Sequence, residues 1–230
     1  MPIRSLILFT LFGVYMHSAQ ALDVSTTTAP ARLSDNAITI GERTLQLPQG
    51  EWTLVAEQKG SLDLDGLPNA RMSTVFLALV KDQSVAAAMI LTLPETSIST
   101  DMKLRWGGDG CDQATGHLYK ETFDSHWRAP ACLLIFNNRN YMGAQNEFMS
   151  KVRKWLNDEK LSASGPHYHI SYSKNGDLDF GVIHIFIPEK SVAFSTDVGN
   201  WGDGLHPQLS RFFEKRDKKA TLPEFPFKPE

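Results

Sequence analysis

The segment MSTVFLALVKDQSVAAAMILTL, residues 72–93, contains the strongest structural signal in this sequence. Two apolar, β-branched runs, Met72–Val80 and Val85–Leu93, flank the polar residues 81–84. Runs of this composition around a short polar break are typical of an antiparallel hairpin that is buried on at least one face. We therefore expect this hairpin to lie in the hydrophobic core.

Shorter strand candidates precede and follow this hairpin along the chain, and turn-forming residues bound each of them. The expected strands cover residues 37–40, 44–47, 52–58, 103–106, 117–123 and 131–136, and a further hairpin is expected between residues 165 and 188. Because most of these strands follow one another as hairpins, we expect one antiparallel sheet.

Two helices are expected after these first strands. Residues 143–160 have the pattern of an amphipathic helix, with apolar residues at three- and four-residue spacing: Phe148, Met149, Val152, Trp155 and Leu156. A shorter helix is expected from Pro207 to Lys219, since proline is tolerated in a first turn and basic residues suit the last one. The sequence thus predicts an α+β fold: a single domain, mainly antiparallel β-sheet built from hairpins, with one long amphipathic helix packed on it and a short C-terminal helix.

Residues 1–21 have the features of a secretory signal peptide. Arg4 precedes the apolar run Leu6–Met16, and Ala19 and Ala21 are small residues at the positions that a signal peptidase reads. The apolar run is shorter than the roughly 20 residues that cross a bilayer. We expect a periplasmic or secreted protein with no membrane span after signal removal.

The rest of the chain divides into three parts. Residues 22–36 (LDVSTTTAPARLSDN) lack periodicity and are expected to be a flexible N-terminal segment. A single domain is expected over residues 37–222. Residues 223–230 are expected to form an extended tail, and its aromatic residues Phe225 and Phe227 could hold it against the domain.

Composition and charge exclude several classes of protein. The chain has 230 residues, of which 42% are apolar and 21% charged, as in ordinary globular proteins. Its 23 basic residues are balanced by 26 acidic ones, so no basic field would attract nucleic-acid phosphates. Nucleic-acid binding is therefore not expected.

The sequence has two cysteines, Cys111 and Cys132. An exported chain meets an oxidising compartment, so we expect them to form a disulfide. The alternative is that one of them is a nucleophile paired with His117 or His126, although no electropositive setting for a reactive thiol is evident.

The hairpin between residues 165 and 188 contains three histidines that a metal ion could use. A two-residue turn at Asn175 and Gly176 would place His167 opposite His184 and bring His169 to the same face. Three imidazoles in this arrangement could bind zinc or copper and leave a position open for a water, which zinc activates as a nucleophile. The alternative is an ordinary half-buried polar margin of the sheet, because no carboxylate can be assigned to orient these rings.

Residues 199–204, GNWGDG, are expected to be a glycine-rich loop. Its backbone N–H groups and the side chains of Asn200, Trp201 and Asp203 could receive an anionic or sugar-like ligand. The alternative is a plain connecting loop with a packed tryptophan.

No motif in the chain specifies a catalytic activity. We expect a non-catalytic binding or interaction protein of the cell envelope, without a cofactor, whose partner is an envelope protein or a small ligand. The alternative function is a metal-dependent hydrolase or lyase that uses His167, His169 and His184 as zinc or copper ligands.

Overall fold

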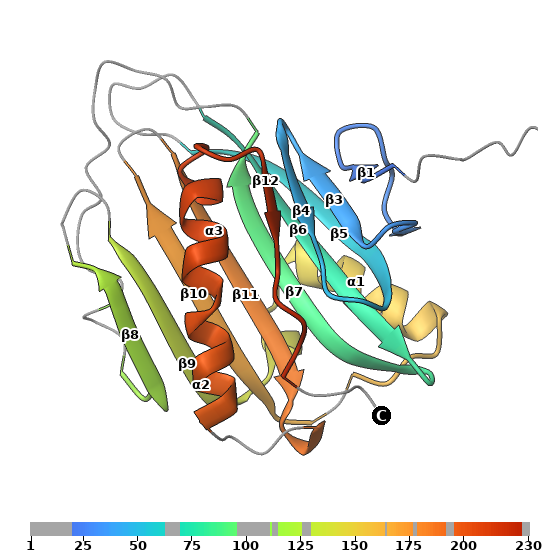
Figure 1. The fold of residues 1–230 in the computed structure, drawn as a ribbon. Helices are drawn as coiled ribbons and strands as arrows, with labels where there is room; N and C mark the ends of the chain where they lie inside the picture. Colours follow the sequence, from blue (N-terminus) through green and yellow to red (C-terminus); the bar gives the residue numbers. More distant parts are fainter. Residues whose placement is uncertain are drawn as a thin grey trace, which may run out of the picture.

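The predicted core hairpin lies at the centre of the protein in a computed structural model of the chain (Figure 1). It consists of β6 (Ala70–Lys81) and β7 (Ser84–Pro94), and Lys81 pairs with Ser84. The turn therefore contains two residues, Asp82 and Gln83, with positive φ angles of 46° and 58°, which is the geometry of a type I′ turn. The structure describes residues 20–62, 70–95, 111, 115–125, 130–163, 165–176, 179–191 and 196–226.

Eight strands form one antiparallel sheet, which confirms the expected architecture. The strand order is β2-β5-β6-β7-β11-β10-β9-β8. The strands flanking the core hairpin are β2 (Ala31–Arg32), β5 (Glu51–Leu62), β8 (Tyr119–Asp124), β9 (Ala131–Arg139), β10 (His167–Asn175) and β11 (Phe180–Pro188). The expected strand at residues 103–106 lies outside the described residues.

A second, four-stranded sheet packs on one face of the large sheet. Its order is β1-β3-β4-β12, formed by β1 (Leu22–Asp23), β3 (Ala37–Ile40), β4 (Arg43–Gln46) and β12 (Lys219–Thr221). The hairpin β3–β4 is the one expected from the sequence, whereas β1 and β12 add to it in parallel.

The expectation that residues 22–36 form a separate flexible segment needs correction. Residues 22 and 23 pair with β3, and residues 31 and 32 pair with β5, so this segment contributes strands to both sheets. Strands of two residues are too short to produce a periodic pattern, and the sequence therefore gives no sign of them.

The helix on the other face of the large sheet is α1 (Glu147–Asp158), with 12 residues instead of the expected span 143–160. Asn146 is the N-cap of α1, because its side chain accepts a hydrogen bond from Met149 N at 2.8 Å. A 3₁₀ turn, η1 (Tyr141–Gly143), occupies the residues before it. Beyond the C-terminal end, Lys160 has a φ angle of 54°, which a helix cannot continue through.

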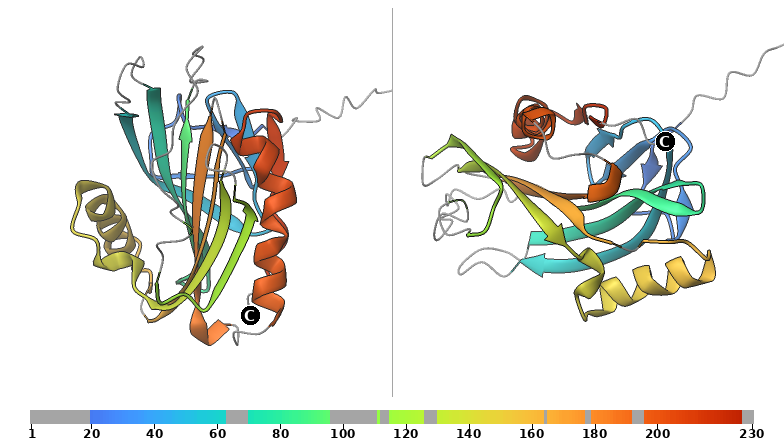
Figure 2. Two further views of the ribbon diagram at one scale, coloured as in Figure 1. Left: turned by 90° about the vertical axis from the view of Figure 1, so that its left-hand side faces the viewer. Right: turned by 90° about the horizontal axis from the view of Figure 1, so that it is seen from below.

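The C-terminal helical region is longer than expected and bent. It consists of α2 (Thr196–Asp203) and α3 (Leu205–Phe213), while a second 3₁₀ turn, η2 (Glu189–Ser191), follows β11. Figure 2 shows α2 and α3 on the face of the large sheet opposite to α1. None of the described helices is long and apolar enough to cross a membrane.

The large sheet therefore separates two hydrophobic cores. The larger core lies between the large sheet, the small sheet, α2 and α3, and the smaller one lies under α1 and η1. Glycines allow close approach in the larger core: a Cβ at Gly181 would lie 2.3 Å from the ring of Phe213, and one at Gly202 would lie 2.8 Å from Leu133. The ring of Phe213 thus packs directly on the backbone of β11 at Gly181, and the backbone of α2 packs directly on the side chain of Leu133 at Gly202.

A buried ion pair joins several elements in the larger core. Arg43 Nη1 lies 3.5 Å from Asp179 Oδ2, and both side chains are at most 2% exposed. The same guanidinium donates to the carbonyl oxygens of Phe212, Phe213 and Pro94 at 3.3, 3.2 and 2.6 Å. Arg43 therefore connects the small sheet to the end of α3, the end of β7 and the loop before β11.

The last described residues, 222–226, lie against the body of the protein without regular secondary structure. The ring of Phe225 packs 6.1 Å from Trp52 and 5.6 Å from Trp201, centroid to centroid. Residues 227–230 and residues 1–19, most of the expected signal peptide, lie outside the described residues.

Candidate functional site

The hairpin β10–β11 brings together two of the three predicted metal ligands, but not in the predicted register. Asn175 pairs with Phe180, so the connection is longer than the expected two-residue turn, and Gly176 N donates to Asp179 O at 2.8 Å inside it. His184 therefore pairs with Ser171 instead of His167. The partner of His184 on β10 is thus four residues farther along the strand than predicted. Side chains alternate between the two faces of a strand, so a shift by an even number of residues leaves each side chain on its predicted face.

His169 and His184 lie diagonally across the two strands on this common face. His169 Nε2 and His184 Nδ1 are 3.0 Å apart, within hydrogen-bond distance. One of the two nitrogens donates its N–H and the other accepts the hydrogen bond through its lone pair. The accepting ring is therefore a neutral imidazole.

Aromatic rings hold His169 in place on both sides. Phe186 stacks on it with a centroid separation of 4.6 Å, and Phe136 stacks on it at 5.6 Å. Burial, together with the neighbouring His184 and Arg139, lowers the pKa of His169 to about 3. Burial also lowers the pKa of His184, so both rings are neutral at neutral pH.

His167 does not join this pair. It faces Pro188 on β11, is 2% exposed, and packs edge-on against Tyr141 with ring centroids 4.9 Å apart. Among the described residues, no three His, Cys, Asp or Glu side chains gather closely enough to hold a metal ion. The predicted three-histidine arrangement is thus reduced to a pair.

The predicted ligand loop at residues 199–204 is helical, which corrects that expectation. Asn200, Trp201 and Asp203 belong to α2. Trp201 is 8% exposed and donates from Nε1 to Glu224 O at 2.7 Å, and Asp203 accepts a hydrogen bond from Tyr119 OH. Gly202 allows α2 to approach Leu133 of β9 closely, so this glycine has a role in packing.

The disulfide between Cys111 and Cys132 is present, as predicted. Both cysteines are at most 5% exposed, and neither is a free thiol, so the nucleophile alternative is wrong. Cys132 lies on β9 opposite Ser173, on the same face of the large sheet as the histidine pair.

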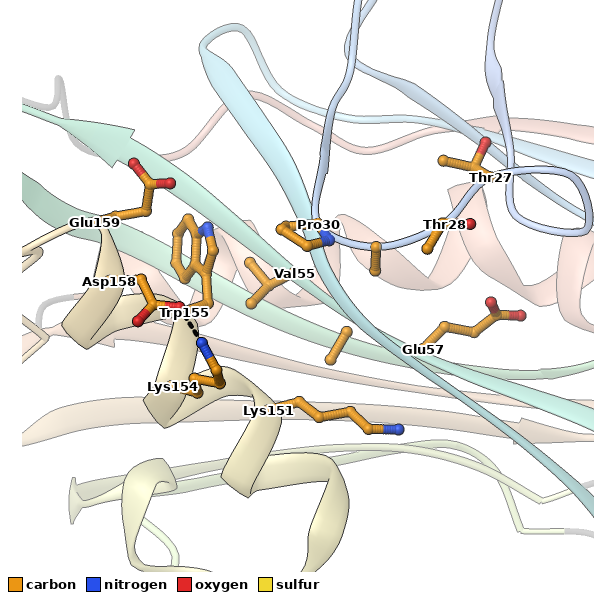
Figure 3. A pocket seen from close by; sticks show the side chains of 12 residues that line it. Thr27, Thr28, Pro30, Val55, Glu57, Lys151, Lys154, Trp155, Asp158 and Glu159 are labelled. Carbon is orange, nitrogen blue, oxygen red and sulfur yellow. Dashed lines mark hydrogen bonds and ion pairs between the residues drawn. The ribbon is translucent and has the colours of Figure 1, made fainter.

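A groove that the sequence did not predict lies where the N-terminal segment meets α1 (Figure 3). It has a volume of about 520 Å³ and is lined by residues 27–30, by residues 55–57 of β5 and by the side of α1 that includes Lys151 and Trp155. A second hollow of about 320 Å³ shares Pro30 and Trp155 with the first. The two hollows are therefore adjacent, and β5 contributes to the lining of both.

The groove combines an apolar floor with polar groups. Figure 3 shows the indole of Trp155 beside Val55 and Pro30, with Lys151 one turn earlier on the same helix, α1. Glu57 Oε1 is buried and accepts no hydrogen bond from the described residues, although Lys59 Nζ lies 3.4 Å from it. This ion pair gives the carboxylate a counter-charge, so Glu57 contributes a polar, already paired group to the margin of the groove.

The strand beside the groove has an open edge. Within the described part of the chain, β2 is the strand that pairs with the outer edge of β5; its register partners are Leu54 and Thr53, and Leu33 N continues the contact to Trp52 O at 2.9 Å. The side chains of residues 58–61, farther along β5, are exposed. The backbone of β5 past Leu54 is therefore placed to accept a further strand.

The signals for this site were distributed over distant segments. Thr27, Thr28 and Pro30 lie in the non-periodic segment 22–36, whose pattern indicates a linker. Lys151 is a polar residue of the amphipathic helix, and its position in the pattern indicates only a solvent-exposed side chain. Comparison with models of protein families, with curated proteins and with solved structures finds no match for this chain. Its function is therefore inferred from the geometry of its own residues.

Proposed function

We propose that this chain is an exported, non-catalytic binding protein of the cell envelope that holds an extended segment of a partner protein in the groove beside β5. The observation that carries the proposal is the position of the groove directly along the unpaired edge of that strand. An extended peptide that adds to a sheet edge gains main-chain hydrogen bonds, while pockets beside the edge select its side chains.

The groove offers the contacts that such a peptide needs. Trp155 and Val55 provide an apolar surface for one side chain of the peptide. Lys151 and Lys154 lie at the rim, 54% and 76% exposed, and pair with Glu147 and Asp158, so charged groups of both signs border the apolar floor.

Export is part of the proposal and has separate support. The Cys111–Cys132 disulfide is compatible with an oxidising compartment outside the cytoplasm. Residues 1–21 carry the charged start, apolar run and small residues of a signal peptide. We do not propose the metal-dependent hydrolase or lyase, because His167 packs against Tyr141 and leaves only two of the three ligands together.

The test is selection of peptides from a displayed random library on the wild-type protein. Thr28 is exposed and lines the groove, so Thr28→Trp fills it without disturbing either core. Thr26 is equally exposed in the same segment but does not line the groove, so Thr26→Trp is the matched control.

Peptides enriched on the wild-type protein should bind Thr28→Trp at least about tenfold more weakly and bind Thr26→Trp within about twofold of wild type. Urea unfolding of all three proteins verifies that neither substitution affects the fold. The proposal is wrong if no peptide is enriched, or if the enriched peptides bind Thr28→Trp as well as they bind the wild type.

A further inference from the structure

The histidine pair places two imidazole nitrogens at a separation close to that of two ligands of one metal ion. The two facing nitrogens, His169 Nε2 and His184 Nδ1, are 3.0 Å apart. In a tetrahedral site with metal–nitrogen bonds of about 2.0 Å, two ligand nitrogens are about 3.3 Å apart. An opening of about 0.3 Å would therefore convert the pair into two ligands of one ion.

The protein holds one of these donors in position before any ion binds. His169 is stacked against Phe136 and Phe186, with interplanar angles of 24° and 15°. Ligand rings that are held in this way do not lose further freedom on binding. Both histidines are only half-buried, so an ion can reach them from solvent.

We propose that His169 Nε2 and His184 Nδ1 bind one divalent transition-metal ion, with Zn²⁺ and Cu²⁺ as the ions best suited to two imidazole donors. The remaining coordination positions are open to water or to an anionic group. His167 is not a ligand in this site. The proposal is independent of the groove, which is built from β5, α1 and the N-terminal segment.

Metal binding at this pair rearranges one proton. A neutral imidazole carries a single N–H proton on one of its two ring nitrogens, and the hydrogen bond between the rings uses one such proton. One of these protons lies between the two rings, and on binding it moves to the remote nitrogen of the same ring, with solvent as carrier. Both facing lone pairs then point at the ion, and the charge of each ring is unchanged.

The experiment is titration of the purified protein, without a polyhistidine tag, with Zn²⁺ by calorimetry in a buffer that does not chelate metals. His169→Phe keeps an aromatic ring in the stack and removes the donor, and His184→Gln removes the other donor. His117→Gln is the matched control, because His117 is exposed and lies before β8, outside the pair. His167→Phe distinguishes the pair from a site with three histidines.

The expected result is one Zn²⁺ per chain, with Kd raised at least about tenfold by His169→Phe and by His184→Gln. Kd should stay within about twofold of wild type in His117→Gln and His167→Phe. Nitrogen NMR of the wild type, which needs no substitution, should show shifts of the ring nitrogens of His169 and His184 on Zn²⁺ addition.

Three results would overturn the proposal. The first is the lack of saturable binding of one ion per chain. The second is unchanged affinity in His169→Phe or His184→Gln, together with unshifted ring nitrogens in the wild type. The third is a loss of affinity in His167→Phe as large as that in His169→Phe, which would favour the three-histidine site.

Discussion

Replacement of Arg43 by methionine should destabilise the protein more than any other single substitution of a charged residue described above. The guanidinium is 2% exposed, lies 3.5 Å from the carboxylate of Asp179 and donates to the carbonyl oxygens of Phe212, Phe213 and Pro94. Methionine fills similar space but leaves a buried carboxylate without its counter-ion. Removal of one partner of a buried ion pair typically costs about 3–5 kcal/mol of folding free energy.

The pH dependence of this loss has a definite sign. Burial raises the pKa of Asp179 from 3.8 to about 6, even though Arg43 beside it acts in the opposite direction. The folded state therefore binds this proton more tightly than the unfolded state, and the free energy of unfolding falls as pH rises from about 4 to 6. Without Arg43 the pKa of Asp179 rises further, so the cost of Arg43→Met should be larger at pH 7 than at pH 5.

Urea unfolding at pH 4, 5, 6 and 7, followed by circular dichroism, measures these effects in wild type, Arg43→Met, Asp179→Asn and the double variant. Asp179→Asn should recover part of the loss in the Arg43→Met background, with a coupling free energy of at least about 1 kcal/mol. In the wild-type background it should remove the fall in stability between pH 4 and 6, a result that does not require Arg43→Met to fold.

The reasoning would be refuted by an Arg43→Met protein within about 1 kcal/mol of wild type at pH 7. It would also be refuted by a double variant that is no more stable than Arg43→Met alone. Either result would mean that the Asp179 carboxylate is solvated in the folded protein.

Three further substitutions or treatments test other parts of the fold. Reduction of the Cys111–Cys132 disulfide, with a sequence separation of 21, should lower the free energy of unfolding by about 3 kcal/mol, measured in urea with and without reductant. Gly181→Ala places a Cβ 2.3 Å from a buried ring and should cost at least about 2 kcal/mol, whereas Gly60→Ala, with no atom within 4 Å, should stay within about 0.5 kcal/mol of wild type. Asn146→Ala removes the cap of α1 and should lower the melting temperature through a loss of about 1 kcal/mol, and an unchanged melting temperature would contradict the capping role.

Sequence patterns predicted those elements whose signals are local and long. The hairpin of β6 and β7 was predicted correctly because both apolar runs exceed the usual strand length and a polar break separates them. In the hairpin β10–β11 the Asn175–Gly176 pair favoured a tight turn, but Asn175 instead pairs with Phe180. Strand pairing therefore overrode the local preference for a tight turn. Sequence periodicity specifies which face a side chain is on, but it does not specify which residues of two strands are paired.

Features built from distant segments could not be predicted. The groove needs residues 27–30, β5 and α1 side by side, and no pattern in any one of them specifies the others. The glycines at 199–204 indicated a loop because a glycine conflicts with helix propensity, yet the tight contact of Gly202 with Leu133 offsets that cost.

The small sheet has a consequence for the order in which the protein can fold. Its two outer strands, β1 and β12, come from opposite ends of the chain. A ribosome must therefore synthesise the chain as far as Thr221 before the edge of β4 can be covered, and Phe225 before the ring of Trp52 acquires its aromatic neighbour. Completion of this layer therefore waits for residues 219–225, and a chain truncated before Lys219 would leave the edge of β4 unpaired and prone to aggregation.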